Sequence, residues 1–171
     1  FMDALAVTGY DGAISLEIFN DRFRAGSAHS VAVDGHRSLI WLMDETARRY
    51  GRSIAGAVAM APPAPVADVE FVEFAVDDSD LVKFETLLSA MGFSKVGRHR
   101  SKSVALWRQG DIRIVVNNDK HGFAHSYQVT HGASVCALAL KVPDARATIA
   151  RAEALLDTPH HGAVGPGELD I

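Results

Sequence analysis

Residues 69–78, VEFVEFAVDD, decide the fold of the larger part of the chain. Valine and phenylalanine favour extended structure, so the first eight of these residues predict a strand with acids interspersed along it. Asp78 or Ser79 can then cap a helix that runs to Met91 and stops at Gly92. The apolar face of this helix would be formed by Leu81, Val82, Phe84, Leu87, Leu88 and Met91.

Three further strands follow this strand and helix. They are predicted over residues 93–98, 104–109 and 112–117, and the last two are joined by the short turn Gly110-Asp111. The order is therefore βαβββ. After an irregular stretch over residues 118–132, a strand over 134–142 and a helix over 144–156 begin the pattern again, which indicates the start of a second copy of the module.

A change of composition precedes the module. Residues 54–67 are rich in alanine and contain Pro62, Pro63 and Pro65. Proline favours an extended, semi-rigid spacer and cannot continue a helix. The sequence therefore predicts three parts: a first domain over residues 1–53, a linker over 54–67 and a second domain over 68–171.

The first part contains residues 12–24, GAISLEIFNDRFR. Apolar residues at 14, 16 and 18 alternate with Ser15, Glu17 and Phe19, which is the period of a strand over residues 13–19. A carboxylate in a strand either faces water or, if buried, needs a partner or a metal, and this window leaves both readings open. A polar loop and a helix over 36–50 follow. A strand with an acid near its end, a polar loop and a covering helix are typical of one α/β-barrel unit.

Both ends of the sequence read as cut. Residues 1–7 fit the last turns of an amphipathic helix, and residues 165–171 stop where a new strand would begin. We expect the chain to be a fragment of a longer protein.

Composition excludes several classes of protein. The 171 residues are 48% apolar with a net charge of -4, and their basic residues are scattered, which argues against nucleic-acid binding. The sequence contains no run long enough to cross a membrane and no secretion signal. The single cysteine, Cys136, lies in an apolar run, so we expect a buried thiol in a cytoplasmic protein.

The eight histidines show no established metal-ligand spacing. His121 and His125 are four residues apart, but a site with open positions would need a third ligand. The basic run 98–102, RHRSK, more often covers a strand end and turn than binds an anion, because it contains no helix N-terminus or glycine nest.

Several motifs in the chain are similar to those of two enzyme families. The motif SLEIFND at 15–21, with Phe23-Arg24 and DGxRSL at 34–39, resembles the last strand and helix of bacterial 3-dehydroshikimate dehydratases of the xylose-isomerase-like barrel family. The second part resembles the N-terminal half of 4-hydroxyphenylpyruvate dioxygenases, which are built from vicinal-oxygen-chelate modules. The motifs that carry this second resemblance are FVEFA at 71–75, MGF at 91–93, HRSK at 99–102, LWRQG at 106–110 and HGxSVCA at 131–137. The implied fold is α/β plus α+β, the last βα unit of a TIM-like barrel followed by a βαβββ module and the start of a second copy.

For the first part, the resemblance implies that Glu17 is one ligand of a divalent metal, Mg, Mn or Co, at the mouth of a barrel. The metal would hold the keto and hydroxyl oxygens of 3-dehydroshikimate and stabilise the enolate as water is lost to form protocatechuate. Asn20, Asp21 and Arg24 are candidate loop contributors, and Arg24 could pair with the substrate carboxylate. The other ligands and the general base would precede this sequence.

For the second part, the resemblance implies a structural role for His99 and His131. The two-His, one-carboxylate iron site of the dioxygenase family lies in its C-terminal half, so an iron site would have to lie downstream of Ile171. Two alternatives to the dehydratase stay open at this point. One is a dioxygenase activity of the second domain, and the other is a module that only packs against the barrel or forms a homo-oligomer.

Overall fold

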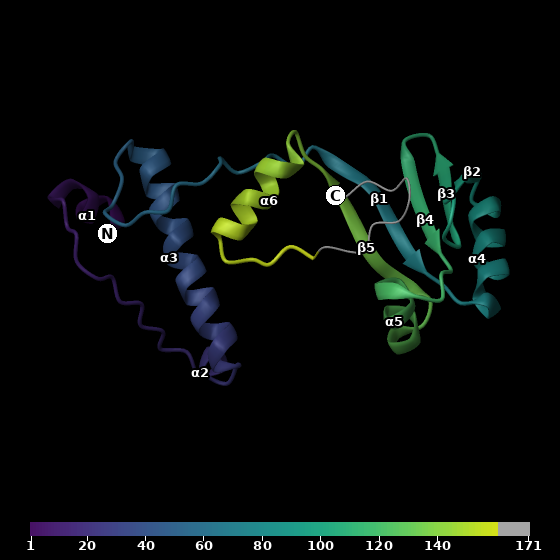
Figure 1. Ribbon diagram of the computed structural model, residues 1–171, viewed down its shortest axis with the longest axis horizontal. Coiled ribbons are helices and arrows are strands. Elements are labelled where there is room, and N and C mark those ends of the chain that lie inside the picture. Colours follow the sequence, from purple (N-terminus) through teal and green to yellow (C-terminus); the bar gives the residue numbers. More distant parts are fainter. Residues whose placement is uncertain (161–171) are drawn as a thin grey trace. The chain divides into compact units, whose positions relative to one another are not determined.

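The computed structural model describes residues 1–160, and the chain divides into two units (Figure 1). Residues 1–64 and 144–160 belong to the first unit, and residues 65–143 form the second. The chain thus leaves the first unit within the predicted linker and returns to it with its last described helix. The predicted boundaries at residues 53 and 67 stay a prediction.

In its described residues, 65–143, the second unit is one mixed five-stranded sheet with two helices. Its elements are β1 (Asp68–Ala75), α4 (Asp78–Ala90), β2 (Ser94–Arg98), β3 (Val104–Gln109), β4 (Ile112–Asn117), α5 (Gly122–His131) and β5 (Ser134–Lys141). The strand order is β2-β3-β4-β1-β5, with β1 parallel to β4 and all other pairs antiparallel. The predicted order βαβββ is confirmed, and β5 extends the same sheet beside β1.

The core of this unit lies between α4 and the sheet. Asp77, one residue before the predicted caps, begins α4 by accepting the backbone N–H of Asp80 at 2.9 Å. Only part of the predicted apolar face of α4 is buried, because Val82, Leu87 and Met91 remain more than half exposed. The buried cluster is Val76, Leu88, Phe93, Ala105, Trp107 and Val116.

The prediction of irregular structure over residues 118–132 was wrong, because residues Gly122–His131 form α5. The residues of this helix have modest helix propensity, and its N-cap His121 makes no side-chain cap bond. Its stability comes from contacts instead. Tyr127 stacks between Phe123 and His131 with ring centroids 5.7 and 4.3 Å away, at the i, i+4 spacing of one helix face.

Within residues 1–160, the helices of the first unit are α1 (Met2–Thr8), α2 (Asp21–Arg24), α3 (Ala28–Tyr50) and α6 (Ala145–Ala154). The helix predicted over 36–50 begins at Ala28, and a short helix capped by Asn20 interrupts the predicted polar loop. Gly35 therefore lies inside α3. A side chain there would begin 3.3 Å from Leu16 Cδ2, so glycine permits the close approach of the segment before α2.

Residues 13–19 form no strand, which corrects the prediction of a strand there. The period-two pattern is nevertheless real, since Leu16 and Ile18 face α3 across one shallow pocket and Ile14 faces α3 across another. A strand also needs a neighbouring strand to pair its backbone N–H and C=O groups. No strand of the first unit lies within the part of the chain that the structure describes.

A buried ion pair holds α6 against α3. Arg151 donates to Asp44 Oδ2 at 2.9 Å, and the two side chains are 9% and 8% exposed. Arg48 binds both oxygens of the same carboxylate. The two guanidinium groups also donate to linker carbonyls, Arg151 to Ala61 and Arg48 to Met60. One carboxylate therefore joins α3, α6 and the linker within the first unit.

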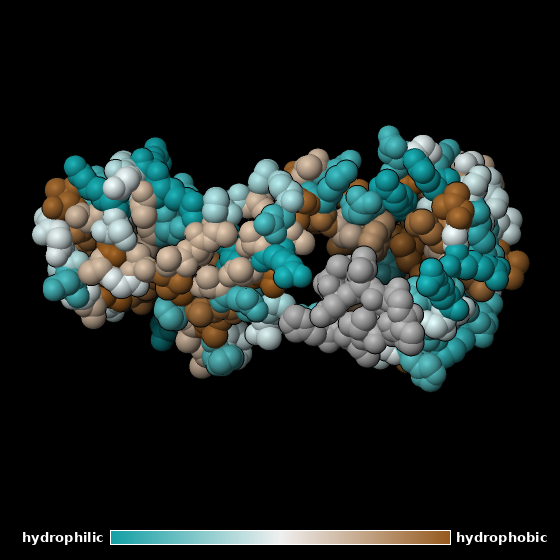
Figure 2. Space-filling view, turned by 45° about the horizontal axis from the view of Figure 1, so that its top comes forward, coloured by the Kyte–Doolittle hydropathy of each residue, from teal (hydrophilic) through white to brown (hydrophobic). Residues whose placement is uncertain are grey.

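Apolar residues remain at the surface of both units (Figure 2). In the first unit Leu16, Ile18 and Trp41 are between 36% and 48% exposed, and Phe19 is 92% exposed. Apolar surface of this kind usually marks a contact. No helix within residues 1–160 is long and apolar enough to cross a membrane. The strand expected to begin near residue 165 lies outside the described residues.

Replacement of Arg151 with methionine should destabilise the first unit by about 3 kcal/mol, because it leaves a buried carboxylate with one partner fewer. This value is at the lower end of the range of destabilisation expected when a buried ion pair is broken, because Arg48 still binds Asp44. Urea unfolding measures the loss, and Arg146→Met on the exposed side of α6 is the matched control. Equal stability of the two variants would contradict the assignment.

The same pair gives stability a pH dependence. Burial alone would raise the pKa of Asp44, but hydrogen bonds from Arg48 and Arg151 outweigh burial and hold the pKa below its ordinary 3.8. The free energy of unfolding that the ionised Asp44 contributes is therefore fully present above pH 3.8, and it is lost as the pH falls through the lowered pKa. The difference in stability between the native chain and Arg151→Met should shrink over that acid range.

Candidate functional site

Glu17 lies in the 13–19 segment and lines neither of the two pockets between this segment and α3. The side chains before and after it, Leu16 and Ile18, line a pocket of about 400 Å³ against α3. Glu17 is exposed, and it makes no hydrogen bond or ion pair with any of residues 1–160. The carboxylate is therefore available as an oxygen ligand, with the opposite side of its segment packed.

Arg24 lies near this segment on α2 and lines the pocket that holds Leu16 and Ile18. Its guanidinium is 3.6 Å from Asp21, and both side chains are largely exposed, so the pair holds Arg24 only weakly. Asn20 has a structural role, since its side chain accepts the backbone N–H groups of Arg22 and Phe23. Of the loop candidates, Arg24 and Asp21 keep exposed charged groups, and Arg24 is the one that could bind a carboxylate.

No three histidine, cysteine, aspartate or glutamate side chains within residues 1–160 come together as a metal site. His121 precedes α5 and His125 lies within it, without a third ligand. His131 stacks on Tyr127, and His99 Nδ1 accepts the backbone N–H groups of Ser101 and Lys102. Both His99 and His131 thus take part in local structure.

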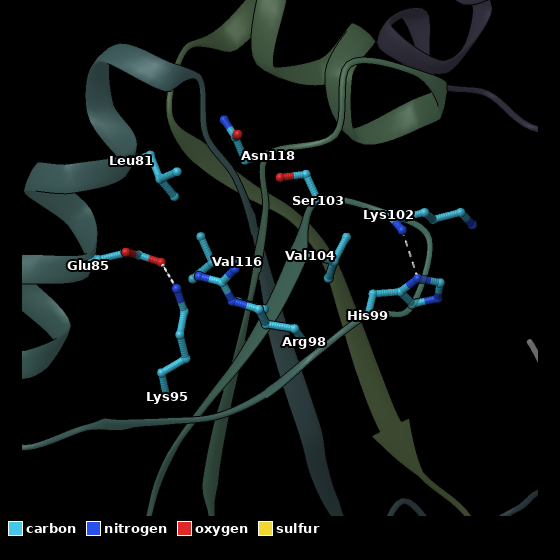
Figure 3. Close-up of a pocket in the computed structure, with 11 residues that line it drawn as sticks. Leu81, Glu85, Lys95, Arg98, His99, Lys102, Ser103, Val104, Val116 and Asn118 are labelled. Atoms are coloured by element: carbon cyan, nitrogen blue, oxygen red, sulfur yellow. Dashed lines mark hydrogen bonds and ion pairs between the residues drawn. The ribbon is translucent and has the colours of Figure 1, made fainter.

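A second candidate site is a pocket of about 290 Å³ in the second unit, between α4 and the sheet (Figure 3). Its apolar wall comes from three different elements, with Leu81 on α4, Ala105 on β3 and Val116 on β4. Its polar wall contains Lys95 and Arg98 from β2 and Glu85 from α4. The pocket therefore has an apolar side and a cationic side.

A β-bulge explains why two cations of β2 face the same pocket. Lys95 pairs with Trp107 and Arg98 with Ala105, and the register shifts between Lys95 and Gly97. Without the shift, residues three apart on a strand would point to opposite faces. The extra residue, Val96, brings both side chains to the face that α4 covers. Sequence reasoning missed this pair, since Gly97 was the only hint of a bulge.

The two cations differ in their partners. Lys95 forms an ion pair with Glu85, and its Nζ lies 5.4 Å from the ring centroid of Trp107. Arg98 is exposed and makes no hydrogen bond or ion pair with residues 1–160. In Figure 3 its side chain extends from β2 toward Val116, whereas a dashed line joins Lys95 to Glu85. Arg98 is the cation that a ligand can engage.

The other side of the sheet carries a polar cluster. Asn117 on β4 donates to Glu73 Oε1 on β1 at 2.7 Å, and the Cys136 thiol on β5 lies 3.6 Å from the Glu73 carbonyl oxygen. Burial, and to a smaller extent the charge of Glu73, raises the pKa of Cys136 to about 11. Cys136 is half-buried, so the expected fully buried thiol is only partly realised.

Residues 60–171 match the family model described as hydroxyphenylpyruvate dioxygenase, HPPD, N-terminal. The chain belongs to this family. A 4-hydroxyphenylpyruvate dioxygenase of Pseudomonas sp. is 38% identical over 64% of this chain and 30% of its own length. The HPPD N-terminal match includes both the five-stranded sheet and α6.

Other relatives match the whole chain. A 3-dehydroshikimate dehydratase of Pseudomonas putida is 43% identical and one of Pseudomonas aeruginosa 42% identical, each over 100% of this chain. The solved structure of a xylose isomerase-like TIM barrel/4-hydroxyphenylpyruvate dioxygenase fusion protein covers 100% of this chain at 41% identity, with a TM-score of 0.85. The chain spans 28% of the length of each of these three proteins. The resemblance to a barrel dehydratase fused to an HPPD-like region is confirmed.

Cys136 should react slowly with thiol reagents in the folded protein. Because the pKa of Cys136 is raised from 9.0 to about 11, the thiolate fraction at neutral pH is lowered about a hundredfold. Iodoacetamide labelling at pH 7.5, followed by mass spectrometry, measures the rate in the native chain and in urea. Comparable rates in the two states would contradict the raised pKa.

Proposed function

We propose that this chain is the junction of a two-part enzyme whose barrel part is a metal-dependent 3-dehydroshikimate dehydratase. The observation that carries the proposal is the match to two such dehydratases over the whole chain, on both sides of the linker. A match to the dioxygenase family alone would have ended near residue 60, where the HPPD N-terminal region begins. The free thiol Cys136 suits the cytoplasmic location that belongs to the proposal.

The direction of Glu17 supports a role as metal ligand. In a βα unit of a barrel, the strand side chains that meet the covering helix point outward, and those between them point to the barrel interior. Leu16 and Ile18 meet α3. Glu17, which alternates with them, would therefore point to the interior, where the active site of a barrel opens at the ends of its strands.

The chemistry of Glu17 fits a divalent cation, because Mg²⁺ and Mn²⁺ prefer carboxylate oxygens and Glu17 is not engaged elsewhere within residues 1–160. Glu17 would supply one oxygen ligand. The remaining ligands would come from regions of the complete protein that its relatives contain and this chain does not. When bound, such a cation polarises the substrate carbonyl as a Lewis acid. Arg24 would orient the substrate by a two-point hydrogen bond to its carboxylate.

Glu17→Gln in the complete protein should lower bound metal and protocatechuate formation together, because an amide is a weaker ligand than a carboxylate. Metal analysis and ultraviolet absorbance measure the two quantities. Asp11→Asn is the matched control, since Asp11 is an exposed acid just before the 13–19 segment. A dehydration rate that stays at the control level would remove Glu17 from the metal site.

We also infer that the region after the linker stabilises the barrel part. Two contacts favour this second function. Arg151 neutralises the buried Asp44, and Arg37 on α3 donates to the backbone carbonyls of Leu155 and Leu156 at 2.6 and 3.2 Å. The residues that follow β5 therefore complete the surroundings of α3 within the first unit. This is a packing role for residues that the family match assigns to the HPPD N-terminal region.

A truncation of the complete protein after Ala67 should consequently lose thermal stability as well as activity. The deletion removes α6 and leaves Asp44 buried without Arg151. A truncation after residue 160 keeps α6 and Arg151 and is the control. Thermal unfolding and the dehydration rate distinguish the two truncated proteins. If the shorter protein melts at the same temperature as the control, α6 makes no contribution to the first unit.

A further inference from the structure

The pocket between α4 and β2 in the second unit is separate from the residues proposed for the barrel site, since neither Glu17 nor Arg24 lines it. It combines an apolar wall with one available guanidinium, which is the arrangement of a site for a small organic anion. Its charges decide the kind of anion. The charged residues that line it are Glu85, Lys95, Arg98 and Lys102, and because Lys95 and Glu85 neutralise each other as an ion pair, the lining has a net positive charge.

Arg98 can bind a carboxylate with two parallel hydrogen bonds, because its planar guanidinium matches the spacing of the two carboxylate oxygens. Lys95 is unsuited to the same task, since Glu85 and the Trp107 ring already hold its ammonium group. The bulge at Val96 is what turns Arg98 toward the pocket. One local irregularity of β2 therefore creates the anion-binding side.

The Leu81 and Val116 side chains, together with Ala105, form the apolar side and suit a flat hydrocarbon body. A volume of about 290 Å³ lies at the lower end of the range for ligand pockets. It admits a single ring and is too small for a nucleotide. His99 also borders the pocket, with its Nδ1 accepting two backbone N–H groups of the turn that follows β2.

We propose that this pocket binds a small aromatic monocarboxylate, with its carboxylate on Arg98 and its ring against Leu81 and Val116. The product of the proposed dehydration, 3,4-dihydroxybenzoate, belongs to this class and is the first probe. Only the choice of that probe rests on the proposed function. The site itself rests on the geometry of the second unit.

The test is isothermal titration of the complete protein carrying Glu17→Gln, so that the barrel site contributes little to binding. The probes are 3,4-dihydroxybenzoate, 3,4-dihydroxybenzyl alcohol, which has the ring without the charge, and inorganic phosphate, which has charge without the ring. We expect the benzoate to bind best. Arg98→Gln should weaken its binding about tenfold or more, as expected for the loss of a charge-assisted bidentate pair.

Arg100→Gln is the matched control, because Arg100 is an exposed arginine of the same turn that does not line the pocket. It should bind the benzoate as the parent does, and Arg98→Lys should fall between the parent and Arg98→Gln. The proposal is overturned if the alcohol or phosphate binds as well as the benzoate, or if Arg98→Gln and Arg100→Gln bind alike. Thermal unfolding of each variant verifies that its fold is intact.

The two proposals fail separately. If Glu17→Gln dehydrates at the normal rate, the metal role of Glu17 is lost, and an effect of Arg98→Gln on benzoate binding still supports the pocket. If no binding is detected up to about 10 mM, which corresponds to a negligible affinity, the pocket proposal is lost and the barrel proposal stands.

Discussion

The buried carboxylate of Asp44 is the constraint on which the first unit depends. A charge removed from water must be paired, and here one partner is local, Arg48 four residues on in the same helix, and the other, Arg151, is distant in sequence and lies on α6. Their remaining N–H groups bind the carbonyls of Met60 and Ala61. Because both arginines bind one buried carboxylate, their hydrogen bonds hold both the linker and α6 against α3. Residues of α6, which lie within the HPPD N-terminal match, thereby pack against α3 in the first unit.

In the second unit, the corresponding constraint is the register of β2. Along most strands of the sheet, side chains alternate between the two faces, and those on one face form the core under α4. The extra residue at Val96 departs from that alternation and turns Lys95 and Arg98 to one face. Glu85 and the Trp107 ring then hold one of the two cations, and the other lies over an apolar pocket. The first residue of the basic run 98–102, Arg98, therefore lies at the pocket, whereas the sequence predicted that this run covers a strand end.

Glu17 illustrates what an alternating pattern of apolar and polar residues can predict. The alternation over residues 14–18 correctly indicates which side chains meet the covering helix. It also indicates that Glu17 lies on the other side. The strand itself does not form among the described residues, since backbone hydrogen bonds of a strand need a neighbour. The same limit applies to the proposed metal site, because one carboxylate is only one ligand.

The sequence by itself determined the βαβββ order, the bounds of β3 and β4, and the resemblance to two enzyme families, because alternation, caps and motifs are local signals. Only the tertiary structure decided that α6 packs on α3, that α5 is a helix, and that Arg98 faces a pocket. These features depend on contacts between residues far apart in the chain, such as Asp44 with Arg151, or on the register of neighbouring strands. Neither kind of contact leaves a periodic trace in the sequence.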